Sequence, residues 1–206
     1  MNRFLCAILF IFSAGSAGAA LPVKGDANKG KAISARACIA CHGPDGNGIS
    51  PPNPDYPKLA AKQPEYLLKQ LKDFKAGKRK NDIMSAMVAS LSPDDMSNLA
   101  VFFAEQKNKP GIVNNPDLLE SGKKFFANGN PDLGVPACAG CHQPDGSGTS
   151  AYPHLAGQHA AYVYQQLKRF ASSERDNDRG LVMQSLALRM TEQEMKAVAE
   201  YVASLK

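Results

Sequence analysis

Residues 38–46 read CIACHGPDG, and residues 138–146 read CAGCHQPDG. Each stretch places two thiols and an imidazole within five residues, in the pattern Cys-x-x-Cys-His. The sequences that follow also align, because YPKLAAKQPEYLLKQLKDF at 56–74 lies against YPHLAGQHAAYVYQQLKRF at 152–170 once the second copy drops four residues from its loop. Self-similarity over such a distance indicates an internal duplication. We therefore expect one structural unit that occurs twice.

Each repeat is expected to consist of helices joined by loops. Pro64 is well placed as the first residue of a helix, and apolar or aromatic residues recur at helical spacing from Tyr66 to Phe74. The segments 28–40 and 116–128, ahead of the two motifs, are predicted to be amphipathic helices. Capping boxes predict the starts of the closing helices, at Ser92 with Asp95 and at Thr191 with Glu194. No segment alternates convincingly as a strand, so the predicted fold class is all-α.

The first twenty residues have the features of an export signal. Arg3 supplies a positive charge, residues 4–12 form a short apolar run, and the small residues that follow offer a cleavage site near Ala19 or Ala20. The apolar run is well below the roughly 20 residues that a membrane-spanning helix needs. We therefore predict a signal peptide at 1–20 that is cleaved from an exported protein.

The length of the mature chain is right for two domains of about 100 residues each. Between the repeats, QKNKPGIVNNPD has the Pro, Gly and Asn content of a linker. We set the boundary near Pro110, which gives an N-terminal domain at 21–109 and a C-terminal domain at 110–206.

The basic residues are unevenly distributed. From residue 21 to Lys107 the chain has 13 Lys and Arg against 9 Asp and Glu, whereas the remainder has 10 of each. Five of the basic residues lie in KDFKAGKRK at 72–80. This run is interpreted as a solvated helix end and loop, and a docking patch for an acidic partner is the alternative. It does not interleave basic and aromatic residues as a nucleic-acid groove does, so no nucleic-acid partner is expected.

Removal of the signal peptide also removes Cys6, which leaves four cysteines, all within the two motifs. A disulfide between cysteines three residues apart would close almost no loop and would stabilise little. A thioredoxin-like pair follows a strand, and a zinc ribbon needs two pairs that converge on one metal. A complete helical unit between the motifs makes that convergence unfavourable. The remaining interpretation is covalent haem attachment, for which Cys-x-x-Cys-His is the recognised signature.

The spacing of the motif suits this attachment. Two thiols three residues apart can add to the two vinyl groups on one edge of a porphyrin, and the next residue then places its imidazole under the iron. We predict two covalently bound haem c groups. The attachment residues and proximal ligands would be Cys38, Cys41 and His42 in the first repeat, and Cys138, Cys141 and His142 in the second.

With these motifs, with YPKL and YPHL in register, and with the duplication, the chain resembles the dihaem cytochrome c4 family of class I c-type cytochromes. The resemblance covers essentially the whole mature sequence. It implies a tandem duplication of a small class I cytochrome c haem-binding helical domain. It also implies that Pro57 and Pro153 offer their carbonyls to the second nitrogen of the ligating histidines. Proline lacks an N–H but keeps its C=O, and such an acceptor fixes the orientation of an imidazole.

An electron carrier usually fills both axial positions of the iron, and a Met thioether opposite His raises the potential. Met84 lies seven residues before Leu91, and Met183 lies seven residues before Met190. Because Leu91 and Met190 both directly precede the capping boxes, these equivalent positions predict Met84 and Met183 as the distal ligands. Met87 aligns with a leucine and is predicted to pack in the core.

Several other residues are predicted to have ordinary structural roles. His154 and His159 align with Lys58 and Gln63 and are expected to be ordinary exposed histidines. Met96 and Met195 match one another on the closing helices and are expected to fill the core. Apolar or aromatic residues at equivalent positions are predicted to line the haem pockets: Leu59, Leu155, Tyr66 and Tyr162.

With both axial positions filled, the protein is predicted to transfer single electrons and not to be an enzyme. The resemblance implies a periplasmic carrier that links a quinol-oxidising complex to a haem-copper terminal oxidase. A dihaem subunit that accepts electrons from a dehydrogenase, such as a sulfide-oxidising flavoprotein, is the first alternative. A dihaem peroxidase would need an open sixth position, which the matching methionines argue against. A haem that only scaffolds a binding module, and association with the membrane surface, stay open.

Overall fold

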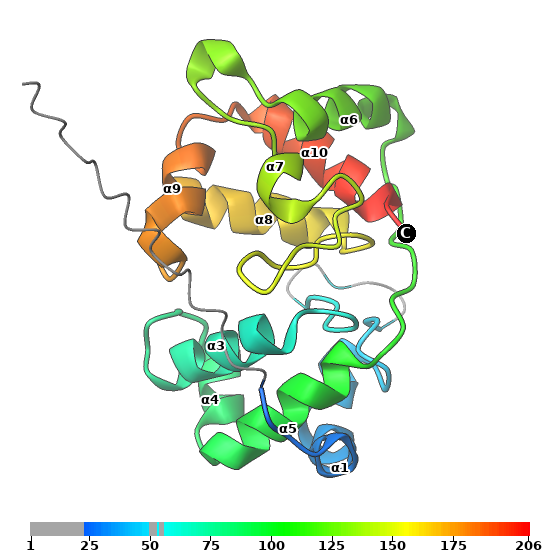
Figure 1. Ribbon diagram of the computed structural model, residues 1–206, viewed down its shortest axis with the longest axis vertical. Coiled ribbons are helices and arrows are strands. Elements are labelled where there is room, and N and C mark those ends of the chain that lie inside the picture. Colours follow the sequence, from blue (N-terminus) through cyan, green and yellow to red (C-terminus); the bar gives the residue numbers. More distant parts are fainter. Residues whose placement is uncertain (1–22, 50–52, 54–55) are drawn as a thin grey trace, which may run out of the picture.

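The structure is a computed structural model that describes residues 23–49, 53 and 56–206. The predicted cleavage site near Ala19 and Ala20 lies outside the described residues. Figure 1 shows two helical bodies stacked along the long axis and joined by a segment that runs down one side. The described residues contain no strand, only an isolated bridge between Asn130 and Val135. The predicted all-α fold is confirmed.

The two bodies repeat the same order of helices. The first unit contains α1 (Ala27–Ala37), α2 (Ile39–His42), α3 (Pro64–Lys75), α4 (Asp82–Val88) and α5 (Pro93–Ala104). The second unit contains η1 (Pro116–Leu118), α6 (Leu119–Asn128), η2 (Pro131–Leu133), α7 (Ala139–His142), α8 (Ala160–Ala171), η3 (Arg179–Leu181), α9 (Val182–Ala187) and α10 (Glu192–Ser204). Apart from the short 3₁₀ helices η1, η2 and η3, each element of one unit has a counterpart in the other. The predicted duplication is therefore present in the fold.

The first and last long helices of each unit pack together at a glycine. A Cβ on Gly30 of α1 would lie 2.2 Å from the carbonyl oxygen of Asn98 in α5. A Cβ on Gly122 of α6 would lie 2.1 Å from the carbonyl oxygen of Ala197 in α10. Contacts this short are not tolerated, so only glycine allows the two backbones to approach so closely.

Local sequence signals locate several helix boundaries. α3 begins at Pro64 as predicted, and both predicted capping boxes form at the starts of α5 and α10. The predicted helix at 28–40 is interrupted near its end, because α1 stops at Ala37 and Cys38, with a φ of −112°, separates it from α2. The motif then forms its own short helix. The segment 116–128 is helical but begins with the 3₁₀ turn η1.

Two short helices, α4 and α9, were not predicted; they carry Met84 and Met183. They span seven and six residues, too few for a helical period to show in the sequence. From the equivalent asparagines to these methionines, the second unit is three residues longer than the first. η3 accommodates these residues, and Gly180 and Leu181 there adopt positive φ values of 67° and 54°.

Each unit has its own hydrophobic core. Met96 and Met195 are 3% and 5% exposed, which confirms that they fill the two cores. The prediction for Met87 is wrong, because its side chain is 41% exposed. Val88 is the buried residue of the short helix α4, whereas Met87 is exposed. The cores also contain Leu67, Leu99, Phe102 and Phe103 in the first unit, and Phe125, Phe126, Leu167, Phe170 and Val198 in the second.

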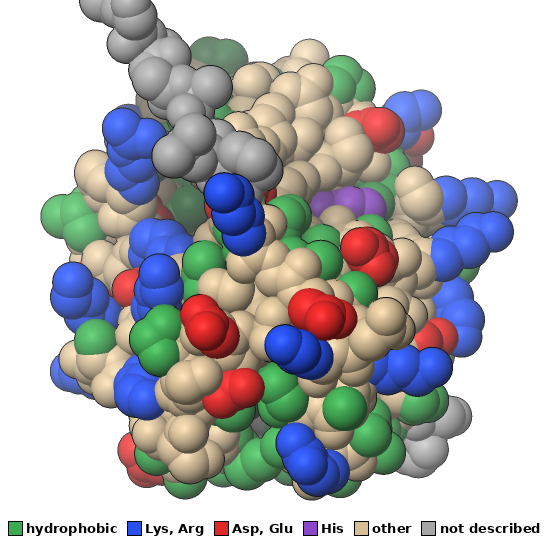
Figure 2. Space-filling model, turned by 60° about the horizontal axis from the view of Figure 1, so that its bottom comes forward, with side chains coloured by type: hydrophobic (Ala, Val, Ile, Leu, Met, Phe, Trp, Pro, Cys, Tyr) green, Lys and Arg blue, Asp and Glu red, His purple; other side chains and the backbone are tan. Residues whose placement is uncertain are grey.

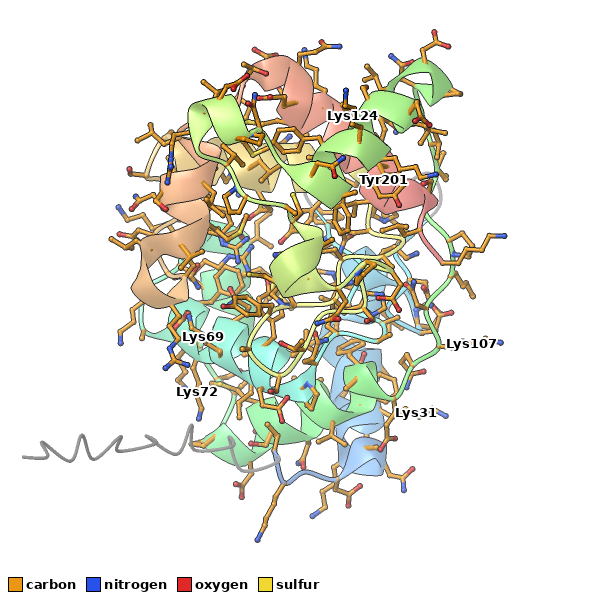
Figure 3. The ribbon with its side chains drawn as sticks, turned by 45° about the horizontal axis from the view of Figure 1, so that its top comes forward. Lys31, Lys69, Lys72, Lys107, Lys124 and Tyr201 are labelled. Carbon is orange, nitrogen blue, oxygen red and sulfur yellow. The ribbon has the colours of Figure 1, made fainter. Side chains whose placement is uncertain are left out.

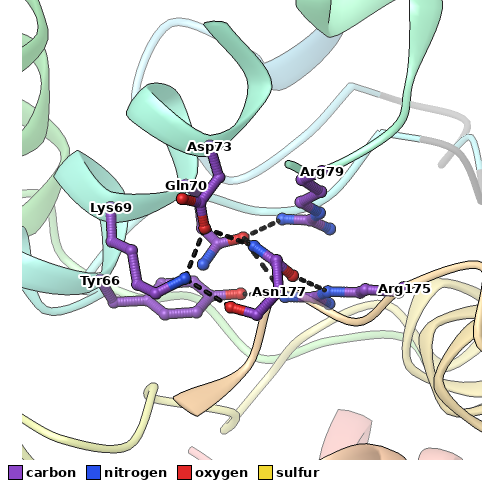
Figure 4. A network of polar contacts seen from close by, with 7 residues as sticks. All are labelled: Tyr66, Lys69, Gln70, Asp73, Arg79, Arg175 and Asn177. Carbon is purple, nitrogen blue, oxygen red and sulfur yellow. Dashed lines mark hydrogen bonds and ion pairs between the residues drawn. The ribbon is translucent and has the colours of Figure 1, made fainter. Parts of the chain in front are cut away.

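The units meet through a polar network that Figure 4 shows from close by. Arg175 of the second unit donates to the Tyr66 hydroxyl at 3.2 Å and to Gln70 Oε1 at 3.4 Å in the first unit. The Asn177 amide donates to Gln70 Oε1 at 3.0 Å and to a carboxylate oxygen of Asp73 at 2.7 Å. Side chains of the second unit therefore bond directly to α3 of the first.

The reciprocal contacts give this interface approximate two-fold symmetry. Arg79 of the first unit donates to the Tyr162 hydroxyl at 2.8 Å and to Gln166 Oε1 at 2.9 Å in the second. Its guanidinium stacks on Phe74 at 4.7 Å, as the second unit's arginine stacks on Phe170 at 4.4 Å. Arg79 is 8% exposed, so the predicted solvated run at 72–80 is wrong at this residue. The four lysines of that run are exposed.

The prediction that His154 and His159 are exposed is also wrong. His159 is 8% exposed and His154 is half-buried, with its backbone N–H donating to Gln63 Oε1 at 2.7 Å. Across the same interface, Lys58 is 2% exposed and its ammonium donates to the Gly157 carbonyl at 2.9 Å. The loops that precede α3 and α8 face one another, so each repeat covers residues that look like surface loop in the other.

Candidate haem-binding sites

Each Cys-x-x-Cys-His motif folds as a single helical turn. The backbone N–H of His42 donates to the carbonyl of Cys38 at 2.9 Å, and the N–H of His142 donates to the carbonyl of Cys138 at 2.9 Å. The residue after each histidine has a positive φ, 75° in the first unit and 67° in the second, so the helix ends there. Two thiols and one imidazole therefore share one turn, as the predicted attachment requires.

The imidazoles are buried and oriented by the predicted prolines. His42 Nδ1 lies 2.8 Å from the Pro57 carbonyl oxygen, and His142 Nδ1 lies 3.0 Å from that of Pro153. Since a carbonyl only accepts, Nδ1 carries the proton and Nε2 keeps the lone pair that can bind a metal. Burial lowers the pKa of both histidines, and this favours the neutral form that ligates.

The four thiols of the motifs are free and half-buried. Burial is the main cause that raises the pKa of Cys38, and it raises the pKa of Cys138 to about 11. Reactive redox cysteines have lowered pKa values in electropositive surroundings, which is the opposite behaviour. Two neutral thiols beside a neutral imidazole with a free Nε2 fit the chemistry of haem c attachment.

Two buried polar atoms near the interface have no hydrogen-bond partner among the described residues: Lys62 Nζ and His159 Nε2. Burial and the nearby charge of Lys58 lower the pKa of Lys62 to about 7. Buried polar groups are nearly always satisfied, so a bound group, an ion or a water is expected to supply a partner to such atoms. Haem carries two propionate carboxylates, and Lys62 Nζ is a donor that such an acceptor fits.

The predicted distal ligands lie at equivalent places with different local support. Met84 and Met183 are both half-buried. The backbone N–H of Met84 donates to Asn81 Oδ1 at 2.8 Å, whereas that of Met183 donates to Asp178 Oδ2 at 2.6 Å. In the second unit Asn177 Oδ1 accepts from Arg175 Nε at 3.1 Å, and the neighbouring aspartate accepts from the methionine N–H instead.

Comparison with known proteins shows the family of the two units. The cytochrome c family model matches residues 27–107 and 119–206, once in each unit. Cytochrome c4 of Pseudomonas aeruginosa is 41% identical over 100% of both chains. The crystal structure of reduced recombinant cytochrome c4 from Pseudomonas stutzeri is 39% identical and superposes with a TM-score of 0.83, covering 89% of this chain and 100% of that one.

The chain belongs to the cytochrome c4 family. Its two cytochrome c domains, each with a Cys-x-x-Cys-His motif, bind two covalently attached haem c groups, one on Cys38 and Cys41 and one on Cys138 and Cys141. The thiosulfate dehydrogenase electron acceptor of Thiomonas intermedia is also similar, with 36% identity over 82% of this chain and 79% of that protein. In the part of this cytochrome that the structure describes, no helix has the length and apolar character needed to cross a membrane.

The residues predicted to line the pockets of this cytochrome divide into two kinds. Leu59 and Leu155 pack against the two hydrophobic cores. The hydroxyls of Tyr66 and Tyr162 instead contact the arginine of the opposite unit. The predictions from sequence missed a further tyrosine in each unit. The ring centroid of Tyr56 lies 6.5 Å from that of His42, and the ring centroid of Tyr152 lies 6.1 Å from that of His142. The shared Tyr-Pro in the two aligned repeats was the available signal for it.

Proposed function

We propose that the protein is a periplasmic dihaem cytochrome that carries single electrons. The observation that carries this proposal is the pair of equivalent contacts from His42 to Pro57 and from His142 to Pro153, each of which leaves one imidazole nitrogen free. Bound haem supplies a one-electron Fe(III)/Fe(II) couple. Two matching sites in one chain support a carrier with two redox centres.

In this proposal His42 and His142 are the proximal ligands and Met84 and Met183 the distal ones. The half-buried positions of both methionines on equivalent helices support it. With both axial positions filled, neither site has a place for substrate, so the protein is a carrier and not an enzyme. The two haem domains meet at the boundary between residues 109 and 110.

We propose that the carrier takes electrons from a quinol-oxidising complex and delivers them to a haem-copper terminal oxidase. A second function is favoured by the similarity to a thiosulfate dehydrogenase electron acceptor. In that role the protein would accept electrons from a periplasmic dehydrogenase. A sulfide-oxidising flavoprotein belongs to the same class of donor.

The test uses the purified holoprotein. An optical redox titration should show two reversible one-electron steps, and mass spectrometry under denaturing conditions should show two added haems. The reduced protein should then be oxidised rapidly by membranes that contain a haem-copper oxidase, and cyanide should block this oxidation. Rapid reduction by a thiosulfate- or sulfide-oxidising dehydrogenase, with no oxidation by those membranes, would favour the second function. Failure to show reversible redox steps would contradict both.

A further inference from the structure

The turn that follows the second long helix has the same backbone in both units. Gly77 and Ser173, at equivalent positions, have φ values of 69° and 63°. Two residues later, the backbone N–H of Arg79 or Arg175 donates to a carbonyl of the preceding helix, at 3.1 Å in the first unit and 3.0 Å in the second. Both arginines are buried in the interface. The two turns are therefore an internal comparison of one conformation.

The exposed residues on either side of the arginine have opposite charges in the two units. The first unit has Lys78 and Lys80, where the second has Glu174 and Asp176. All four side chains are exposed, and none has a hydrogen bond or ion pair among the described residues. Because the same turn forms with either sign of charge, the fold does not require lysines at positions 78 and 80. Their selection needs another explanation.

The positive charge extends from this turn along α3. Lys72 and Lys75 are exposed in its last turn. The last turn of α8 also has two basic residues, Lys168 and Arg169, so the two units differ in the sign of charge at the turn and not along the helix. A hollow in this surface is lined by Lys69, Lys72 and Lys78 together with Leu68, Ala76, Glu65 and Asp73. Figure 3 shows Lys72 projecting outward, and Figure 2 shows Lys and Arg side chains gathered along the edges of the face formed by the first unit.

The position of this surface links it to the redox centre. The turn leads directly into α4, which carries the proposed distal ligand Met84. A partner seated on the turn would therefore lie next to the start of α4. A cluster of like charges on one face raises the encounter rate with an oppositely charged partner and disfavours partners of the same sign.

We propose that Lys72, Lys75, Lys78 and Lys80, which we name the lysine face, are the docking site for a redox protein with an acidic surface. This proposal rests on the proposed electron-carrier function and adds a direction to it. The acidic partner exchanges electrons through the first unit, because the equivalent surface of the second unit has Glu174 and Asp176 and does not attract it.

The duplication supplies the test variants. The double substitution Lys78→Glu with Lys80→Asp installs the residue types that the second unit already tolerates in this conformation. The matched control is Glu174→Lys with Asp176→Lys. The reduced holoprotein is mixed in a stopped-flow instrument with hexacyanoferrate(III), an anionic one-electron oxidant, and separately with tris(phenanthroline)cobalt(III), a cationic one. Each oxidant takes one electron from a haem iron, which goes from Fe(II) to Fe(III). A poly-L-glutamate peptide serves as the probe for an acidic protein surface.

We expect the lysine-face variant to react about tenfold more slowly with the anionic oxidant at low salt and to lose most of its salt dependence. Poly-L-glutamate should slow the oxidation of the wild-type protein by the anionic oxidant and not that of this variant. The changes in the NMR spectrum of the wild-type protein on adding the peptide should map to the lysine face. The control keeps the lysine face and replaces the acidic residues of the second unit by lysines, so it should respond to the peptide at least as strongly as the wild type. Redox titration of each variant verifies that the driving force is the same. Unchanged rates and unchanged peptide binding in the lysine-face variant would overturn the docking proposal. A protein that gives electrons to neither oxidant would contradict the carrier function instead.

Discussion

At the scale of single residues, the sites depend on which nitrogen of each imidazole holds the proton. The carbonyl of Pro57 accepts from His42 Nδ1, and that of Pro153 accepts from His142 Nδ1. The same fixed tautomer in both units leaves Nε2 for the iron. Burial of both rings disfavours the imidazolium, so protonation does not compete readily with ligation.

The distal ligands are tested by single substitutions. Met84→Ala and Met183→Ala should each remove about half of the weak long-wavelength absorption that reports Fe(III)–thioether bonding, because each removes one of two thioethers. Each should also lower the potential of one haem. Met87→Ala is the matched control, since Met87 is exposed on the same helix as Met84. Loss of the band in Met87→Ala, with an intact band in Met84→Ala, would show that Met87 and not Met84 is the ligand.

At the scale of elements, the crossing of α1 with α5 depends on Gly30. A Cβ there would collide with the carbonyl of Asn98, which is backbone and cannot move without shifting α5. Gly30→Ala should therefore destabilise the holoprotein by about 1–3 kcal/mol, the usual cost of overpacking. Gly140→Ala is the control, because nothing lies within 4 Å of a Cβ at Gly140 and the first motif already has Ala40 there. Denaturant unfolding that gives equal stabilities for the two variants would contradict this account.

The predictions from sequence succeeded where the signal was local. Pro64 marked the start of α3, and capping boxes marked the starts of α5 and α10, because neighbouring side chains determine these boundaries. They failed for Arg79, His154 and His159, which are polar residues in or beside loops and are covered by the other unit. Contacts between units join residues about one hundred positions apart, and no local pattern reports them.

The candidate sites follow the same division. The motif and its proline acceptor were visible because the duplication places them in register twice, at Pro57 and Pro153. The unsatisfied Lys62 and His159 could not be found in this way. They lie in different repeats, and their lack of a partner is known only once both loops are in place.

At the scale of the whole molecule, the paired arginines hold the two units in one arrangement. Arg79 and Arg175 are buried and bond to neutral amides and hydroxyls of both units. Arg79→Met keeps the apolar stem but removes the donor to the Tyr162 hydroxyl, whereas Gln70 and Gln166 keep their bonds from Arg175. Each buried group left unsatisfied costs about 1–3 kcal/mol. The variant should lose stability, and its two units should unfold in separate steps. Denaturant unfolding followed by the absorption of each haem measures this. Lys80→Met, on the exposed side of the same turn, should behave as the wild type, and a variant at Arg79 that does so as well would contradict the role of the network.

The interface should also make stability depend on pH through His154. Burial, aided by the charge of Lys62, lowers the pKa of His154 to about 4 from its ordinary value of 6.5. Between these values the unfolded chain binds a proton that the folded protein does not, so stability is highest above pH 6.5 and falls as the pH drops toward 4. In His154→Gln the glutamine does not titrate, so the difference in unfolding free energy between the variant and the wild type should change in favour of the variant as the pH falls. The other histidines are common to both proteins and cancel in that difference. A constant difference across this range would show that the pKa of His154 is the same in the folded holoprotein and in the unfolded chain. Burial of His154 at the interface would then not make the stability of the protein depend on pH.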